Sequence, residues 1–218
     1  MPGKVLRSIN VRMPAFAVAM GVILAGCGGN PGPVVTIYMN GDQSGYVESG
    51  SYHAAVHAVE PVVGDVDSDT RGSILRGILQ FPIDTIPHAA AVTEAKIVLT
   101  QCKVVGNPYG VHGNVFVDHI TFTDPFDTSA FDSPAIGATL GVISDNAKLE
   151  KKSLTVTTAV QADLAAGRSS TQYRLRMPVF NGPPDTVSNY AVFNTLGLDH
   201  ILCPSTTSGY PILIVTYH

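Results

Sequence analysis

The strongest constraint on the fold is a series of short segments with alternating apolar and polar residues or a β-rich apolar composition. These segments are 34–39, 73–81, 92–101, 113–120, 173–177 and 212–217. Alternation with a period of two places apolar side chains on one face of a β-strand and polar side chains on the other. Turn residues separate the segments, such as Asn40-Gly41, a dipeptide favoured between antiparallel strands. The sequence therefore predicts antiparallel β-structure.

A single short helix is expected among these strands. Thr157 and Thr158 are suited to cap its start, and it continues through Asp163 to Ala166, where Gly167 is suited to end it. Only 14% of the residues are charged, and Gly, Pro, Thr and Val are plentiful, as in turn-rich β proteins. The predicted fold is all-β: a two-sheet antiparallel β-sandwich of the jelly-roll type with one short helix.

The N-terminal residues have the parts of an exported lipoprotein signal in order. Three basic residues precede an uncharged apolar run at 15–24, and Leu24-Ala25-Gly26-Cys27 is the pattern that lipoprotein signal peptidase recognises. A transmembrane anchor fits less well, because about ten helical residues extend only about 15 Å against a hydrocarbon core of roughly 30 Å. The sequence predicts a bacterial lipoprotein in which residues 1–26 are removed and Cys27 carries the lipid.

Three regions follow from this prediction: a signal peptide at 1–26, the lipidated Cys27 with a flexible tether to residue 33, and one domain at 34–218. Gly28 after the cysteine favours the outer membrane or cell surface. The signal holds three of the 13 basic residues and none of the 17 acidic ones, so the mature chain has a net charge of −7. This charge argues against nucleic acid as a partner, and membrane contact is expected through the lipid alone.

Two cysteines remain after lipidation, Cys102 and Cys203. In an oxidising exported compartment an isolated pair is most simply a disulfide, and two separate buried thiols are the alternative. Neither residue lies in a CxxC motif or a Cys/His cluster, so metal binding by the pair alone is disfavoured.

Three stretches carry a family signature. The first runs from Arg71 through Gln80-Phe81-Pro82-Ile83 and Ile86-Pro87 to the alternating segment at 92–99. The second is the strand-to-helix passage at 154–164, and the third is the ending Tyr210-Pro211-Ile212-Leu213-Ile214-Val215-Thr216-Tyr217. Taken in order they resemble the DNRLRE-type domain, a carbohydrate-binding-module-like β-sandwich of exported bacterial proteins. The resemblance implies a sandwich that binds carbohydrate.

Catalytic motifs are missing from the sequence. It contains no GxSxG, no HExxH, no phosphate-cradling loop and no dinucleotide fingerprint. A glycosidase needs only two opposed carboxylates, which sequence alone does not exclude. However, Asp124, Asp127 and Asp132 lie among Thr, Ser and Pro, which suits surface loops. The chain is predicted not to be an enzyme and to require no cofactor.

Alternating carboxylates at Asp65, Asp67 and Asp69 suggest a calcium-binding loop, because Ca²⁺ prefers several hard oxygen ligands. The complete EF-hand pattern is absent, and a solvated acidic turn is the alternative. His53 and His57 lie four residues apart, and Glu60 follows them. Zinc would require a third ligand such as His112 or His119, and a polar strand with solvent-facing histidines is the alternative.

Sugar binding needs aromatic rings to stack on the sugar and polar groups to bind its hydroxyls. The candidate residues are Tyr46, Tyr52, Tyr109 and Tyr190, with Arg174 and Arg176 as candidates for an acidic polysaccharide. For each tyrosine a core position with a satisfied hydroxyl is the alternative. For the arginines the alternative is neutralisation of acidic neighbours.

These features favour a lipid-anchored, non-catalytic module of the cell surface or envelope that binds a polysaccharide or another envelope glycan. The alternative is a structural or adhesive protein that acts through protein contacts or self-association. The absence of Trp favours this second interpretation. A polysaccharide-degrading enzyme fits least well.

Overall fold

The computed structural model describes residues 32–50, 54–57, 60–68, 71–178, 186–194, 203 and 209–218. The strands in these ranges are β1 (Val34–Tyr38), β2 (Gly45–Gly50), β3 (Ala54–His57), β4 (Val62–Ser68), β5 (Arg71–Pro82), β6 (Val92–Val105), β7 (Val115–Ile120), β8 (Gly141–Ser144), β9 (Lys151–Thr155), β10 (Ser170–Arg176), β11 (Asn189–Phe193) and β12 (Ile212–Tyr217). The helices are α1 (Pro108–Val111) and α2 (Thr157–Ala165), with 3-10 turns η1 (Gly41–Gln43) and η2 (Thr128–Phe131).

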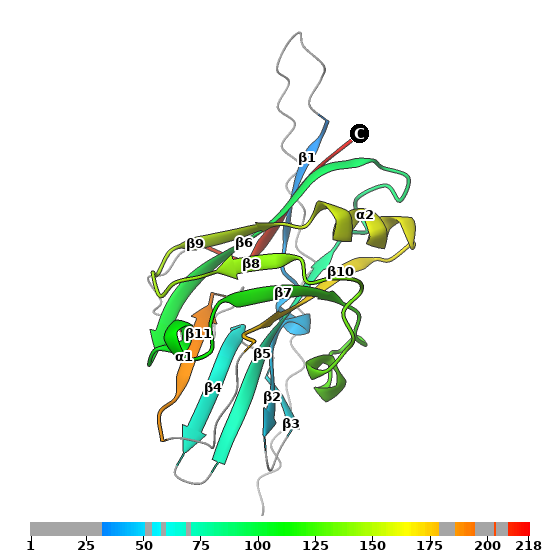
Figure 1. Ribbon diagram of the computed structural model, residues 1–218. Helices are drawn as coiled ribbons and strands as arrows, with labels where there is room; N and C mark the ends of the chain where they lie inside the picture. The colour runs from blue at the N-terminus through cyan, green and yellow to red at the C-terminus, as the bar shows by residue number, and fades with distance from the viewer. Residues whose placement is uncertain are drawn as a thin grey trace, which may run out of the picture.

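All strand pairs in these ranges are antiparallel, which confirms the predicted all-β, sandwich-like fold. The strands form one hydrogen-bonded sheet in the order β1-β12-β6-β11-β4-β5-β10-β7-β8, with β9 beside β6, β2 beside β5, and β3 beside β2. The expected two sheets are therefore joined. The joint is β6, whose first part pairs with β12 and β9 and whose last part pairs with β11 (Figure 1).

The main core lies between the two layers that β6 connects. One layer consists of β1, β12, β9 and the first part of β6, and it is called the β1 layer below. Its inward side chains alternate as predicted, so that Ile37, Ile97 and Leu213 are buried against Phe81 and Tyr173 of the other layer. Burying these apolar side chains is the main stabilising contribution, at about 25 cal/mol per Å² of apolar surface.

A second apolar cluster covers the outer face of β5. Val47, Ile78 and Ile120 from the strands are buried together with Phe126 and Phe131. The two phenylalanines belong to the long connection from β7 to β8, which includes η2. This connection closes the outer face of the β5 side of the sandwich.

The predicted helix is present as α2, and its end agrees with the prediction because Gly167 follows in a left-handed conformation with φ of +69°. Its start differs from the prediction, since Val156 occupies the cap position without a side-chain hydrogen bond. Thr157 Oγ1 instead accepts a hydrogen bond from the Ala95 N–H at 2.9 Å, so it fixes the helix to β6. The one-turn helix α1 was not predicted.

Candidate binding site

Two of the predicted sugar-binding tyrosines, Tyr46 and Tyr190, lie on the same face of the sheet. Tyr190 of β11 pairs with Gly64 of β4, and Gly64 pairs with Leu75 of β5. Tyr46 of β2 pairs with Gly77, two residues further along β5. Cross-strand partners share a face, and residues two apart on a strand also do so. Both tyrosines are half-buried and pack against the apolar cluster that contains Leu75.

On this Tyr46–Tyr190 face a glycine stands opposite each ring on the neighbouring strand, Gly64 opposite Tyr190 and Gly77 opposite Tyr46, and the Leu75 side chain packs with both rings. A Cβ added at Gly64 would lie 2.1 Å from the Asn189 carbonyl oxygen and 2.6 Å from the Tyr190 Cα. Gly64 also has a φ of +135°, which L side chains rarely adopt. The backbone geometry therefore requires glycine beside Tyr190.

Acidic groups surround Tyr46. Burial raises the pKa of Tyr46, and the nearby charges of Glu48 and Glu60 raise it further, as does Tyr190 to a smaller extent. The phenol consequently keeps its proton at neutral pH and can donate a hydrogen bond. Glu48 pairs with Leu75 and so lies on the same face, where its carboxylate can accept hydrogen bonds.

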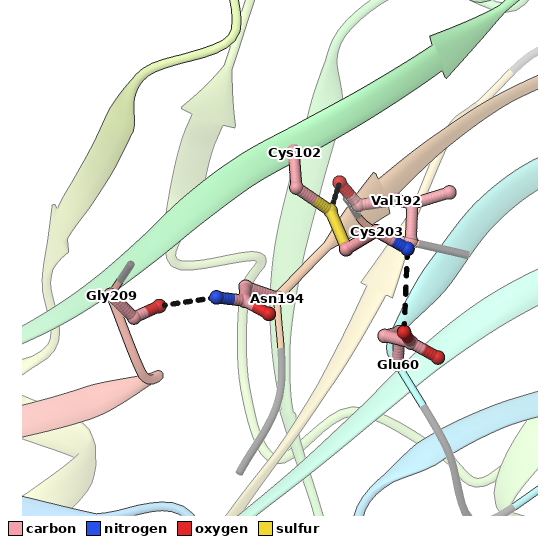
Figure 2. Close-up of a disulfide and its surroundings, with 6 residues drawn as sticks. All are labelled: Glu60, Cys102, Val192, Asn194, Cys203 and Gly209. Carbon is pink, nitrogen blue, oxygen red and sulfur yellow. Dashed lines mark hydrogen bonds between the residues drawn. A yellow bond between two sulfur atoms is a disulfide. The ribbon is translucent and has the colours of Figure 1, made fainter. Parts of the chain in front are cut away.

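A disulfide belongs to the same apolar cluster as the two tyrosines and confirms the predicted cysteine pair (Figure 2). Cys102 of β6 and Cys203 are joined with 5.5 Å between their Cα atoms, and both are buried in the cluster with Leu75. Glu60 Oε1 accepts a hydrogen bond from the Cys203 N–H at 3.4 Å. The covalent link and this contact hold residue 203 against the strands that carry the two tyrosines.

Tyr109 lies elsewhere, in a polar network inside the sandwich. Its hydroxyl contacts Gln101 Oε1 and lies 2.7 Å from Ser144 Oγ, and Gln101 also bonds two backbone carbonyls. Burial is the main cause that raises the pKa of Tyr109 to about 12. Tyr109 therefore matches the alternative expectation, a tyrosine whose hydroxyl is satisfied inside the fold.

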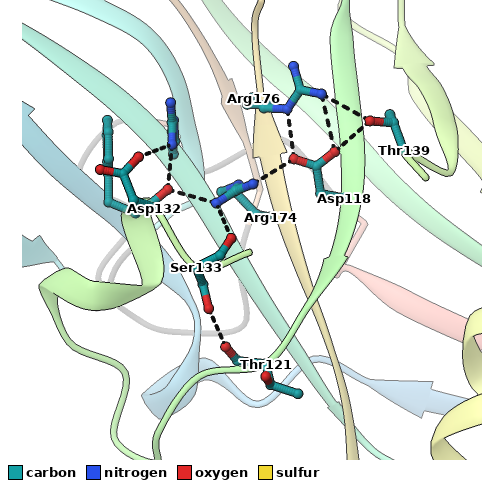
Figure 3. A network of polar contacts seen from close by, with 9 residues as sticks. Asp118, Thr121, Asp132, Ser133, Thr139, Arg174 and Arg176 are labelled. Atoms are coloured by element: carbon teal, nitrogen blue, oxygen red, sulfur yellow. Dashed lines mark hydrogen bonds and ion pairs between the residues drawn. The ribbon is translucent and has the colours of Figure 1, made fainter. Parts of the chain in front are cut away.

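Arg174 and Arg176 face away from the buried Tyr173 as predicted, but their guanidinium groups hold a buried carboxylate (Figure 3). Asp118 of β7 accepts hydrogen bonds from Arg174 Nη2 at 2.8 Å and from Arg176 Nε at 2.7 Å. Thr139 Oγ1 donates to the same carboxylate at 2.9 Å. The arginines thus neutralise an acidic neighbour, the alternative that the sequence left open.

The arginine network also fixes the β7–β8 connection. Arg174 Nη1 donates to the carbonyl oxygens of Phe131 and Ser133, each at 2.8 Å. Arg76 of β5 donates to the Phe131 carbonyl and to Asp132, and its guanidinium carbon lies 3.9 Å from the centre of the Phe131 ring. Because Arg174 is only 8% exposed, its side chain is positioned to hold this connection rather than to line a groove.

Asp65 is engaged with protein groups. Its Oδ1 lies 2.8 Å from His112 Nε2 and accepts a hydrogen bond from the Asn189 N–H at 2.9 Å. The backbone N–H of the neighbouring Asp67 donates to Ser188 Oγ at 3.1 Å. Within the ranges given above, no group of three or more His, Cys, Asp or Glu side chains is placed to hold a metal ion.

His119 is buried and contacts α2. Its Nε2 lies 2.9 Å from Asp163 Oδ2, and Arg168 Nη1 donates to Asp163 Oδ1 at 2.7 Å. His112 and His119 therefore contact separate carboxylates on different strands and helices. Each histidine thus connects two parts of the sandwich: His112 contacts Asp65 of β4, and His119 of β7 contacts Asp163 of α2.

Several predicted residues lie outside the described part of the chain: Cys27, Tyr52, His53 and Asp69, as does the predicted signal peptide at 1–26. His57 is placed only through its backbone, opposite Tyr46. Among the residues that are described, no helix has the length and hydropathy needed to cross a bilayer.

Two exposed tyrosines, Tyr38 and Tyr210, were not predicted as site residues. Their rings lie 6.3 Å apart in an edge-to-face arrangement. The sequence could have indicated this exposure. Tyr38 ends β1 between the apolar residues Ile37 and Met39, which are buried, and neighbouring residues of a strand point to opposite faces. No protein-family model and no curated protein matches the chain.

Proposed function

We propose that this chain is a lipid-anchored, non-catalytic module of the bacterial cell surface or outer membrane, and that it binds carbohydrate on the Tyr46–Tyr190 face. The anchor is the predicted lipid on Cys27, and the module is the β-sandwich, which we infer to be of the DNRLRE type. Structural calcium at Asp65, Asp67 and Asp69 stays part of the hypothesis, because three carboxylates can supply the oxygen ligands that Ca²⁺ prefers.

The observation that carries this proposal is the meeting of Tyr46 and Tyr190 on one face, although 144 positions separate them in the chain. Two half-buried rings beside a glycine offer apolar surface on which the C–H face of a sugar can stack. The Tyr46 hydroxyl is a hydrogen-bond donor and the Glu48 carboxylate is an acceptor, which are the two kinds of group that bind sugar hydroxyls.

Charge favours a neutral sugar at this face. Glu48 and Glu60 lie close enough to raise the pKa of Tyr46, so an acidic sugar would meet like charge there. Arg174 and Arg176, the candidates for binding an acidic polysaccharide, are both engaged with Asp118 on the outer side of β10. We therefore propose a neutral polysaccharide or glycan as the ligand.

The test is a binding measurement with the purified full chain, lipid included, in mild detergent. The probes are neutral polysaccharides (β-glucan, xylan, mannan and dextran) and acidic alginate, each with calcium and with a chelator. Tyr46→Ala and Tyr190→Ala are each expected to weaken binding at least about tenfold, which corresponds to about 1.4 kcal/mol, because each removes a stacking ring. Tyr109→Phe is the matched control and should leave affinity unchanged.

The proposal fails if the folded protein binds none of these polysaccharides, or if both alanine variants bind as tightly as the original chain. If the chelator abolishes binding, calcium is required for the site to bind the polysaccharide. Binding of alginate in preference to the neutral chains would contradict the proposed ligand class.

A second candidate function, adhesion or self-association, is favoured by β1. This strand is at one end of the sheet order and contains the uncharged residues Val34, Val35, Thr36, Ile37 and Tyr38. Natural sheet edges usually carry charge, proline or a bulge that discourages pairing with another chain. Sedimentation of the purified protein over a range of concentrations would detect such association.

A further inference from the structure

The outer face of the β1 layer is a four-stranded surface built from rows of cross-strand partners. One row contains Tyr38, Ile212, Val98 and Ser153, which belong to β1, β12, β6 and β9. The next row contains Thr36, Ile214, Lys96 and Thr155. Since Ile37, Ile97 and Leu213 point into the core, the residues of these rows point outward.

This outer face reaches solvent along its whole width. Tyr38 is 54% exposed and Tyr210 is 49% exposed, and Ile212, Ile214 and Val98 are each partly exposed. The opposite outer face of the sandwich is different, because Phe126 and Phe131 of the β7–β8 connection bury the apolar residues there. Among the described residues, the chain thus buries one apolar sheet face and leaves the other partly exposed.

The exposed rings lie at one end of this surface and hydroxyl groups lie across it. Tyr38 and Tyr210 form an edge-to-face pair, and both rings are about half exposed, so aromatic surface is accessible at this end of the sheet. Ser153 and Thr155 on β9 and Thr36 on β1 are exposed. Such hydroxyls can donate and accept hydrogen bonds with sugar hydroxyls.

The charges on this surface nearly cancel. Lys96 Nζ lies 3.1 Å from Glu94 Oε1, and this pair belongs to adjacent outward positions of β6. The two central rows otherwise contain only apolar residues and hydroxyls, and Lys151 lies at the β9 edge. An uncharged ligand therefore meets no unfavourable charge here, whereas an acidic or basic macromolecule finds no complementary field.

We propose that the outer face of the β1 layer is a second carbohydrate site, which takes an extended chain of a neutral polysaccharide laid across β1, β12, β6 and β9 with Tyr38 and Tyr210 as its stacking residues. This inference rests on the proposed function and adds a separate site to it. The four strands span about 14 Å from β1 to β9 at roughly 4.8 Å per strand, which is long enough for several sugar units.

A neutral polysaccharide fits this face better than a second copy of the chain does. A protein interface of this kind has an apolar, close-packed centre. Here the apolar side chains of Ile212, Ile214 and Val98 share the two central rows with Thr36, Thr155 and Ser153, so polar hydroxyls would be buried without defined partners. A polysaccharide supplies hydroxyl groups at close intervals and can pair with them.

The experiment compares two double variants of the purified full chain, Tyr38→Ala/Tyr210→Ala and Tyr46→Ala/Tyr190→Ala, with Val111→Ala as an exposed control on α1. Binding to β-glucan, xylan, mannan, dextran and alginate is measured by isothermal titration, and thermal unfolding is recorded for each protein. We expect Tyr38→Ala/Tyr210→Ala to weaken binding to a neutral polysaccharide at least about tenfold without changing the unfolding midpoint, because both rings are exposed.

The outcomes separate the two proposals. Unchanged affinity in Tyr38→Ala/Tyr210→Ala, with loss only in Tyr46→Ala/Tyr190→Ala, overturns this inference and leaves the proposed function intact. If only Tyr38→Ala/Tyr210→Ala loses affinity, the β1-layer site is supported, and the proposal that carbohydrate binds at the Tyr46–Tyr190 face is wrong. If the original chain binds none of the polysaccharides, both proposals are wrong. Concentration-dependent dimers that Tyr38→Ala/Tyr210→Ala dissociates, without polysaccharide binding, would assign the face to a second copy.

Discussion

Asp118 shows at the scale of single residues how the sandwich uses a buried charge. Its carboxylate is 2% exposed and is bonded by Arg174, Arg176 and Thr139. Burial alone raises the pKa of Asp118, but the hydrogen bonds from Arg176, Arg174 and Thr139 together outweigh it and lower the pKa below its usual value. The charged form is consequently the one that the fold stabilises.

Asp118→Asn is expected to lower the free energy of unfolding by about 3 kcal/mol at pH 7, because it leaves the Arg174 guanidinium buried without its counter-ion. The pH dependence follows from the lowered pKa. The stability that Asp118 contributes is present above the unfolded-state pKa of about 3.9 and is lost as the pH falls through the folded-state value. Urea unfolding between pH 3 and pH 7 measures both effects.

Asp132→Asn is the matched control for this prediction. Asp132 also bonds an arginine, Arg76 at 2.9 Å, but its side chain is 84% exposed. An exposed ion pair contributes at most about 1 kcal/mol. If Asp118→Asn and Asp132→Asn destabilise the protein equally, or if the acid-dependent loss persists in Asp118→Asn, the role given to Asp118 is wrong.

At the scale of elements, two connections hold the layers in register. The strand β6 contains 14 residues, long enough to pair with β12 and β9 in one layer and with β11 in the other. Helix α2 is fixed to β6 by the hydrogen bond from Ala95 N–H to Thr157 Oγ1, and by one from Val92 N–H to Gln161 Oε1 at 2.7 Å. Asp163 fixes the same helix to His119 of β7.

Thr157→Val is expected to lower the free energy of unfolding by about 1–3 kcal/mol, because it leaves the Ala95 N–H without its side-chain acceptor. Thr158→Val is the control. Thr158 is the next residue of α2 and is exposed. Replacing Thr by Val changes the intrinsic helix propensity by the same small amount at both positions. Chemical denaturation measures the free energy of unfolding of both variants. If both lose the same amount, the hydrogen bond to Thr157 does not have the role given to it here.

At the scale of the whole molecule, the two ends of the domain lie together and away from the hairpin of β4 and β5. The start of β1 and the C-terminus are near one end in Figure 1, and the end of β4 and the start of β5 are at the opposite end. The Ala91 N–H donates to the His218 carbonyl at 2.9 Å, which holds the C-terminus against the start of β6. The disulfide adds a link between positions 101 residues apart.

This arrangement gives the predicted lipid anchor a defined consequence. A lipid on Cys27 would be joined through the predicted tether to the start of β1, which lies at the end of the domain opposite the β4–β5 hairpin. Mass spectrometry of the protein from membrane fractions should find residues 1–26 removed and acyl chains on Cys27. Cys27→Ser should lack the acyl mass, and an original chain without it would contradict the predicted anchor.

The sequence alone was sufficient for the parts of this protein that depend on local pattern. The alternation at 92–101 identified the inward residues Ala95, Ile97 and Leu99, and the segment before Gly167 identified α2. Both follow from periodicity and from the backbone freedom of glycine, which act within a few residues. The pair Cys102–Cys203 could also be predicted, because only two cysteines remained besides Cys27, which is predicted to carry the lipid.

Weak local patterns hid several strands. The strands β4 and β9 read Val-Val-Gly-Asp-Val-Asp-Ser and Lys-Lys-Ser-Leu-Thr, which lack the regular alternation of a half-buried strand. Their partners in the sheet, rather than their own composition, make them strands. For the same reason the sequence did not show that β6 joins the two layers into one sheet.

Only the tertiary structure decided which polar and aromatic residues meet. It placed Tyr46 beside Tyr190, enclosed Tyr109 with Gln101, and aimed Arg174 at Asp118 instead of a groove. It also left the Tyr38 and Tyr210 rings about half exposed on the outer face of the β1 layer. The physical reason is that the folded backbone makes neighbours of side chains that no local pattern connects, and the energy of a buried polar group depends on the partner it finds there.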